Sequence, residues 1–403
     1  MVFLVVVLSV LAGVHYYLWH RLARATTRPG PVRGRLGLVA VGLFALVVVT
    51  FVGQRVPWLS WLAWPGFLWV AIMFYLFWIL LALEVPRAVA GVVLRARKPA
   101  GAPMMEPAKV PAGGPREPVV PGDAPADPGR RLFLGRATAL VAGVGALGTV
   151  GYGVTRALGD PVIERAAVTL PGLDSRLSGL RFAVVSDIHL GPLTGRAHAE
   201  RIVRMINGLE ADVVAIVGDM VDGTVEALGP LARPLRDLES RYGSYFVTGN
   251  HEYYTANGPG EWVEELSDLG VRSLRNERVE IRHQGAVLDL AGVNDVTGAT
   301  AGDAPDFGKA LGGRDESRSV VLLAHQPVHV AEAARYGVDL QLSGHTHGGQ
   351  MVPFNLIVPL QQPVVSGLAT VDGVQVYVTR GAGFWGPPVR VGAPPEITLL
   401  EIR

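Results

Sequence analysis

The chain reads VVAIVGDMVDG over residues 213–223. A run of β-branched and apolar residues ends abruptly at Gly218-Asp219, which is the pattern of a buried strand that brings a carboxylate to the edge of a sheet. Glycine has no side chain, so other groups can approach the backbone closely at this point. Asp222 follows on the turn that leaves the strand. We predict that Asp219 lies between two metal ions and that other strand ends supply the remaining ligands.

Four further polar clusters also follow short apolar runs. In an extended chain, residues two apart point to the same side, so the side chains of an Asp-x-His or His-x-His pair can share one ion. One such cluster is weak evidence, because a single histidine is more often structural. Five clusters in one chain, which contain five of its ten histidines, favour a metal site. The other four are Asp187-Ile188-His189, Gly249-Asn250-His251-Glu252, His325, and Gly344-His345-Thr346-His347.

Short apolar strands alternate with amphipathic helices over residues 160–403. This alternation predicts an α/β layered fold with helices on the outside, and the chemistry is expected at the strand ends. We predict strands over 181–186, 213–217, 244–248, 319–324, 340–343, 374–379 and 397–402, helices over 198–209, 225–238, 262–269 and 330–336, and a hairpin over 279–290.

The order DIH, GDMVD, GNHE, AH and GHTH resembles that of the calcineurin-like metallophosphoesterases over nearly all of residues 160–403. The surrounding SDIHLG, TGNHEYY, SGHTHGGQ and GFWGPP are similar to the membrane-anchored or twin-arginine-exported bacterial branch. The resemblance implies a four-layer αββα sandwich with a binuclear metal centre. It also implies the ligands: Asp187, His189, Asp219 and His347 for one ion, and Asp219, Asn250, His325 and His345 for the other, with Asp219 bridging.

The donor set of imidazoles, carboxylates and one amide, without thiolate, suits Mn²⁺, Fe or Zn²⁺. Two such ions would neutralise the charge of a phosphate ester and lower the pKa of bound water, so that a shared hydroxide attacks the phosphorus. The resemblance makes His251 the acid or charge stabiliser beside the leaving group, oriented by Asp222. We interpret Glu252 as structural. Arg380, before the glycine-rich stretch 381–386, is either a phosphate contact or a structural residue.

Three apolar runs of membrane-spanning length lie over residues 2–19, 36–52 and 58–85, and they account for the high mean hydropathy of +0.32. Five arginines lie between the first two runs, one lies between the second and third, and three arginines with a lysine follow the third. Because positive residues stay in the cytoplasm, we predict an outer amino terminus and an inner end of the third span.

Residues 99–128 contain nine prolines and are expected to form an extended spacer. Arg130-Arg131 then precedes a milder apolar run over 137–154, which is either a fourth transmembrane helix or a twin-arginine-like signal anchor. Both alternatives place the following residues outside the cytoplasm. The predicted domains are therefore a three-span membrane region (1–98), a linker (99–129), a fourth span or anchor (130–158) and a metallophosphoesterase domain (160–403).

Composition excludes several function classes. The formal net charge of +1 gives no basic field for nucleic acid, and the absence of cysteine excludes disulfides, thiolate metal sites and cysteine nucleophiles. We predict a membrane-anchored phosphoesterase that hydrolyses phosphate mono- or diesters, with envelope or lipid-linked substrates as candidates. The alternative is a membrane scaffold or sensor whose outer domain binds phosphorylated ligands without turnover. The sequence leaves the substrate, the metals and the oligomeric state open.

Overall fold

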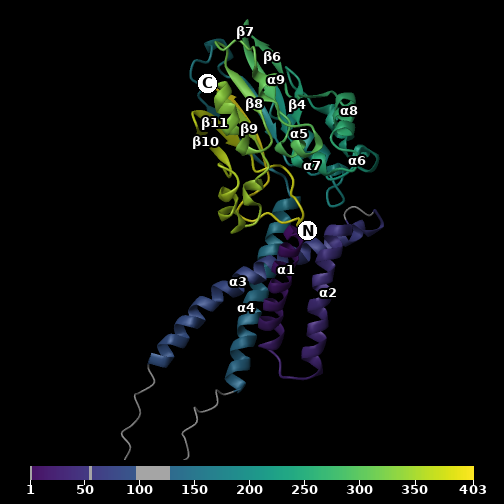
Figure 1. The fold of residues 1–403 in the computed structure, drawn as a ribbon, viewed down its shortest axis with the longest axis vertical. Coiled ribbons are helices and arrows are strands. Elements are labelled where there is room, and N and C mark those ends of the chain that lie inside the picture. Colours follow the sequence, from purple (N-terminus) through teal and green to yellow (C-terminus); the bar gives the residue numbers. More distant parts are fainter. Residues whose placement is uncertain (1, 54–56, 97–127) are drawn as a thin grey trace, which may run out of the picture. The chain divides into compact units, whose positions relative to one another are not determined.

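The computed structural model describes residues 2–53, 57–96 and 128–403 (Figure 1). The chain forms two compact units: one contains Met1–Val52 and Trp69–Val150, and the other contains Gly53–Leu68 and Gly151–Arg403. The first is called the helical unit below, and the second is called the catalytic unit. The proline-rich linker predicted over residues 99–128 lies, except for Pro128, outside the described residues.

Long apolar helices dominate the amino-terminal part of the chain. They are α1 (Val2–Trp19), continued by the π-helix η1 (His20–Arg24), α2 (Pro31–Gly53), α3 (Ala63–Ala96) and α4 (Pro128–Leu158). Within the described residues, four stretches are long and apolar enough to cross a membrane: Leu4–Arg24, Pro31–Gly53, Trp58–Pro86 and Leu132–Leu158. A helix suits that environment because all of its backbone hydrogen bonds lie within the segment.

Some polar side chains inside the helical unit pair with one another. The guanidinium of Arg21 lies 2.7 Å from a carboxylate oxygen of Glu84. The indole Nε1 of Trp69 donates to Nε2 of His15 over 3.2 Å. Ionisable groups in apolar helices are expected to pair in this way, because an isolated charge in the bilayer is costly.

Two six-stranded sheets form the centre of the catalytic unit (Figure 1). In each sheet four strands are mutually parallel, so their carboxyl ends lie at one edge: β2 to β5 in the first sheet, and β7, β8, β9 and β11 in the second. In order, the first sheet contains β1 (Val162–Val168), β12 (Glu396–Ile402), β2 (Arg181–Val185), β3 (Val213–Val217), β4 (Ser244–Val247) and β5 (Val271–Ser273). The second contains β10 (Gly367–Val371), β11 (Val374–Val378), β9 (Leu340–Ser343), β8 (Val320–Leu323), β7 (Ala286–Gly292) and β6 (Glu277–His283).

Alternating side chains of the central strands fill two different cores. On β2, Phe182 and Val184 pack between the two sheets, whereas Ala183 and Val185 pack under the helices of the first sheet. Burial on both faces explains why these strands read as continuous apolar runs in the sequence. A third core lies on the outer side of the second sheet, around Phe307 and Val330.

Helices cover the outer faces of both sheets and complete the predicted four-layer αββα sandwich. The first sheet is covered by α5 (Arg196–Asn207), α6 (Val225–Ala232) and α8 (Gly260–Asp268), and the second by α9 (Phe307–Leu311) and α10 (Val330–Ala333). A short helix, α7 (Asn250–Tyr254), follows β4. The 3₁₀ turns are η2 (Pro57–Leu62), η3 (Ser175–Leu177), η4 (Arg233–Asp237), η5 (Val296–Ala301), η6 (Pro327–His329), η7 (Ala334–Tyr336), η8 (His347–Gly349), η9 (Phe354–Leu356) and η10 (Val358–Leu360).

The element boundaries depart from the sequence prediction in several ways; the predicted helix over 330–336, for example, ends at Ala333 and continues as the turn η7. The predicted helix over 225–238 ends at Ala232, and the turn η4, with Pro234 in its first positions, continues the chain. Proline lacks the N–H that an α-helix needs, which accounts for the change. The strands β1, β5 and β10 were not predicted, since β5 has only three residues and the other two are partly exposed edge strands.

Candidate metal centre

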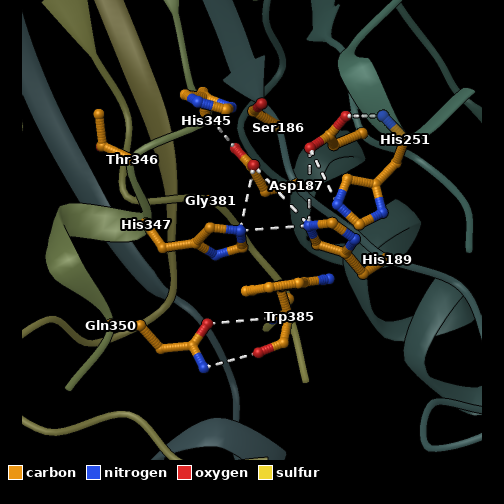
Figure 2. A network of polar contacts seen from close by, with 12 residues as sticks. Ser186, Asp187, His189, His251, His345, Thr346, His347, Gln350, Gly381 and Trp385 are labelled. Atoms are coloured by element: carbon orange, nitrogen blue, oxygen red, sulfur yellow. Dashed lines mark hydrogen bonds and ion pairs between the residues drawn. The ribbon is translucent and has the colours of Figure 1, made fainter. Parts of the chain in front are cut away.

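The sequence-predicted ligands gather where five strands end. Figure 2 shows Asp187, His189, His345 and His347 among them. Asp187 follows β2 and Asp219 follows β3, while Asn250 begins the helix after β4. His325 follows β8, and His345 follows β9 in the other sheet. Because the carboxyl ends of parallel strands share one edge, the two sheets bring these side chains to a common site.

Candidate ligand atoms lie within a few ångströms of each other. In one group, His347 Nε2 lies 3.3 Å from Asp187 Oδ1 and 3.2 Å from His189 Nε2. In the other, His325 Nε2 lies 3.1 Å from Asp219 Oδ2, and the rings of His325 and His345 are 5.1 Å apart. The ligand atoms of each trio, Asp187–His189–His347 and Asp219–His325–His345, lie within 4.8 Å of one another.

Strained backbone conformations coincide with these ligands. Ten non-glycine residues of the described chain have positive φ, and half of them belong to the predicted ligand set. Such left-handed conformations cost energy for residues with a side chain, and they occur preferentially at functional sites. Here they turn the chain sharply at the strand ends. The five residues are Asp187 (51°), His189 (48°), Asp219 (50°), His345 (71°) and His347 (50°).

Gly218 and Gly249, which lie close to Asp219, leave no room for a side chain because neighbouring atoms approach their backbones closely. A Cβ atom on Gly218 would lie 2.6 Å from Nδ1 of His325, and φ of +85° adds a backbone conformation that disfavours other residues. A Cβ atom on Gly249 would lie 2.2 Å from Oδ1 of Asp219. The structure thus agrees with the expectation that groups approach the backbone closely at Gly218.

Three buried polar atoms without hydrogen-bond partners indicate whether the residues of this site could bind a metal. Asp187 Oδ1, Asn250 Oδ1 and His325 Nε2 are buried and have no hydrogen-bond partner among the described residues. A buried polar atom without a partner is costly, so native proteins seldom contain one without a reason. All three can offer a lone pair, and all three belong to the predicted ligand set. The residues therefore fit divalent cations.

The ring nitrogens not needed for ligation are held by hydrogen bonds. Nδ1 of His325 donates to the carbonyl oxygen of Val217 over 2.7 Å, which in the neutral ring leaves a lone pair on Nε2. That lone pair faces Asp219 Oδ2, so a cation between the two atoms would satisfy both. Such second hydrogen bonds orient metal-binding histidines.

Protons compete with metal ions for the same atoms. Burial lowers the pKa of His325, but the carboxylates of Asp219 and Asp187 outweigh that effect and raise the pKa to about 10. Burial and nearby His325 lower the pKa of His345 to about 4, so this ring is neutral at pH 7. Metal binding is therefore expected to release protons from the site.

Arg390 is a site residue that the sequence analysis missed. Its side chain is fully buried, and it donates from Nη1 to the carbonyl oxygen of His347 over 2.7 Å and from Nε to that of Gly383 over 2.9 Å. Burial, together with the positive charge of Arg390, holds the pKa of His347 well below its usual value. The neutral imidazole that results is the form that binds metals. No motif marks this lone arginine in the sequence.

Asp222 joins a candidate ligand to the candidate acid. Its Oδ1 accepts from Nδ1 of His189 over 2.9 Å and from Nδ1 of His251 over 2.7 Å. These two bonds explain why His189, Asp222 and His251 form a third close group of possible ligands. The contact with His251 is the one expected from the sequence, and the contact with His189 was not anticipated.

Glu252 and Arg380 have structural partners. Glu252 Oε2 accepts from the backbone N–H groups of Gly249 (2.6 Å) and Asp219 (3.1 Å), which ties the ends of β3 and β4 together. Arg380 forms ion pairs of 2.5 Å with Glu164 and Glu396. These contacts support the structural alternative for Arg380 over the phosphate contact.

The chain is similar in sequence to known proteins. The family described as calcineurin-like phosphoesterase matches residues 180–349. A transmembrane protein with metallophosphoesterase domain from Danio rerio is 40% identical over 262 residues, which is 62% of this chain and 60% of that protein. The Bos taurus protein of the same name is 40% identical over 263 residues, covering 62% and 59%. The chain thus spans about three fifths of the length of these two relatives.

A bacterial relative matches over a larger share of its own length. An uncharacterized metallophosphoesterase from Helicobacter pylori strain J99 is 39% identical over 262 residues, which is 64% of this chain and 68% of that protein.

Proposed function

The chain belongs to the metallophosphoesterases, which are metal-dependent hydrolases of phosphate esters, and we propose that it is a membrane-anchored enzyme that hydrolyses phosphate mono- or diesters with two divalent ions. The observation that supports this proposal most directly is the convergence of buried lone pairs without partners. Asp187 Oδ1, Asn250 Oδ1 and His325 Nε2 are buried without a hydrogen-bond partner among the described residues, and each sits at a strand end of the site.

Each ion has a proposed ligand set. One would be held by Asp187, His189, Asp219 and His347, and the other by Asp219, Asn250, His325 and His345, with Asp219 shared. The imidazole, carboxylate and amide donors favour Mn²⁺, Fe or Zn²⁺. When bound, the ions supply charge neutralisation of the ester and a nucleophile at neutral pH.

The chain itself contributes proton transfer on the leaving-group side. We expect Nε2 of His251 to donate a proton to the leaving oxygen, and the 2.7 Å contact between Asp222 and the opposite ring nitrogen supports this role. Burial lowers the pKa of His251, but Asp219 and Asp222 outweigh it and raise the pKa above its ordinary value. The protonated ring is thereby favoured near neutral pH, as a general acid requires.

A metal titration tests the hydrolase. The full chain in detergent, stripped with a chelator, is expected to hydrolyse neither p-nitrophenyl phosphate nor bis(p-nitrophenyl) phosphate. Adding Mn²⁺, Zn²⁺, Fe²⁺ or Mg²⁺ singly is expected to restore turnover, and the better ester decides between mono- and diesterase. Two bound ions per chain without turnover of either ester would instead favour the non-hydrolysing scaffold.

The catalytic unit is proposed to lie outside the cytoplasm, next to envelope substrates. Support comes from the arginine distribution and from the fourth apolar helix, which ends at Leu158, shortly before β1. In cells, alkaline phosphatase fused after Val168 is expected to be active, and a fluorescent cytosolic reporter at the same position is expected to be dark. The reverse result would place the catalytic unit in the cytoplasm.

A further inference from the structure

We propose that the metal site takes phosphate esters whose apolar tails remain in the bilayer, and that residues 352–360 dip into the membrane beside the mouth of the site. The proposal rests on the proposed hydrolase function and adds the class of substrate. The stretch 352–360, which contains η9 and η10, is called the apolar loop below.

The apolar loop exposes large hydrophobic side chains. Leu356 is 74% exposed and Leu360 is 86% exposed, and Phe354 and Ile357 are also exposed. From Gly348 to Val371 the sequence contains no charged residue. Soluble proteins rarely expose an apolar patch of this kind, and such patches mark binding or membrane surfaces.

Hydrogen bonds connect the apolar loop to the end of α4. The N–H of Val352 donates to the carbonyl oxygen of Val391 over 3.0 Å, and the N–H of Arg390 donates to the carbonyl oxygen of Gly153 over 3.0 Å. Gly153 belongs to the candidate span Leu132–Leu158 and lies in its last turns. The loop is therefore fixed near the level at which this span would leave the bilayer, which makes a lipid surface its expected partner.

A second segment of the catalytic unit also indicates where the membrane surface lies. Trp58, Trp61 and Trp64 are all exposed, and they lie at the start of a candidate span. Tryptophan is enriched where a membrane meets water, so these three rings are expected to mark that boundary. The same segment approaches the site, since a Cβ atom on Gly386 would lie 3.3 Å from the ring of Phe67.

Trp385 connects the apolar loop to the metal centre (Figure 2). Gln350, two residues before the loop, donates from Nε2 to the carbonyl oxygen of Trp385 over 2.9 Å and accepts from the N–H of Trp385 over 3.0 Å. The ring of His251 lies 6.0 Å from the indole ring of Trp385 and 5.3 Å from the ring of Tyr254. Both aromatic rings are about half exposed, so they form an apolar rim beside the candidate acid.

This arrangement favours an amphiphilic substrate. The phosphate would contact the ions, while the rest of the bound ester would extend past His251 and across the two aromatic rings towards the apolar loop. A small polar phosphate ester would gain nothing from that surface, whereas an alkyl tail would stay in contact with apolar groups throughout. The site would therefore select a phosphate ester that carries a lipid tail.

A single-cysteine probe tests the membrane contact without any activity measurement. The chain has no cysteine, so Leu356→Cys can be labelled specifically with an environment-sensitive fluorophore in the full chain, reconstituted in phosphatidylcholine–phosphatidylglycerol nanodiscs. Ser317→Cys, exposed before the amino end of β8 and so away from the metal-site edge, is the matched control. We expect spin-labelled lipids to quench the probe at residue 356 and not at residue 317. Equal quenching at the two positions would overturn the membrane contact.

A pair of esters tests the substrate class. Methylumbelliferyl phosphodiesters with a hexadecyl or a methyl group, and the corresponding monoesters of hexadecanol and methanol, are supplied with Mn²⁺ and nanodiscs. Wild-type protein is expected to prefer the tailed ester, and the double change Leu356→Ser with Leu360→Ser is expected to lower the tailed-to-tailless ratio about tenfold. Changing both leucines to phenylalanine should preserve the ratio. An unchanged ratio in the serine variant, or no preference for the tail in wild type, would overturn the inference alone, whereas turnover of no ester would overturn the hydrolase function.

Discussion

Replacing Asp219 by asparagine is expected to lower kcat on a phosphate ester by about 1,000-fold or more. Oδ2 of Asp219 lies 3.1 Å from Nε2 of His325 and 3.9 Å from Nε2 of His189, so one carboxylate faces ligands of both proposed ions. Asparagine has the same size but removes the negative charge and presents an N–H₂ group to one of the two sides. Loss of a partner that only supports a ligand costs 10–100-fold in other enzymes, so loss of a shared ligand is expected to cost more.

The measurement combines turnover with the metal content of the purified chain. Asp219→Asn should contain fewer than two ions per chain after loading with Mn²⁺ and dialysis. Asp289→Asn is the matched control, because Asp289 is a buried carboxylate on β7 that belongs to none of the possible ligand groups among the described residues. It should keep turnover within about twofold of wild type, as a change away from the site usually does. Full turnover with two bound ions in Asp219→Asn would show that Asp219 does not bridge them.

The central strands and their polar ends could be predicted because burial leaves a clear pattern. β3 is buried on both faces, with Val213, Ala215 and Val217 between the sheets and Val214 and Ile216 under the helices. A strand of this kind reads as an unbroken apolar run, and its end is marked where the first polar residue appears. The predicted ligands all follow such ends, which is why short sequence motifs were sufficient to place these residues at the edge of the sheets.

Edge strands and distant contacts could not be predicted in the same way. β1 pairs with β12, so its partner lies at the far end of the chain, and its partly exposed side chains alternate without a strong apolar run. Arg390 acts through hydrogen bonds to the backbone of His347 and Gly383, which no local pattern records. The apolar loop reads VPFNLIVPL in sequence and looks like core, and only its exposure in the fold shows that it faces outwards.

Replacing His251 by alanine is expected to separate proton transfer from metal binding. For an alkyl phosphate ester, whose leaving group needs a proton, kcat should fall by about 100- to 10,000-fold, the range typical of a general acid. For a p-nitrophenyl ester, whose leaving group is stable as an anion, the loss should be less than about tenfold. Two ions per chain should remain bound, since His251 is outside the proposed ligand sets.

The pH profile gives a second readout that a purely structural role would not change. Because Asp219 and Asp222 raise the pKa of His251 against the effect of burial, the acid form is present at neutral pH and is lost as the pH rises through that pKa. Wild-type kcat on the alkyl ester should therefore fall on the alkaline side, and this fall should be absent in His251→Ala. Asp222→Asn keeps a hydrogen-bonding group but removes the charge, so the fall should move to lower pH. Equal losses on both esters, with an unchanged profile, would mean that His251 positions the site and donates no proton.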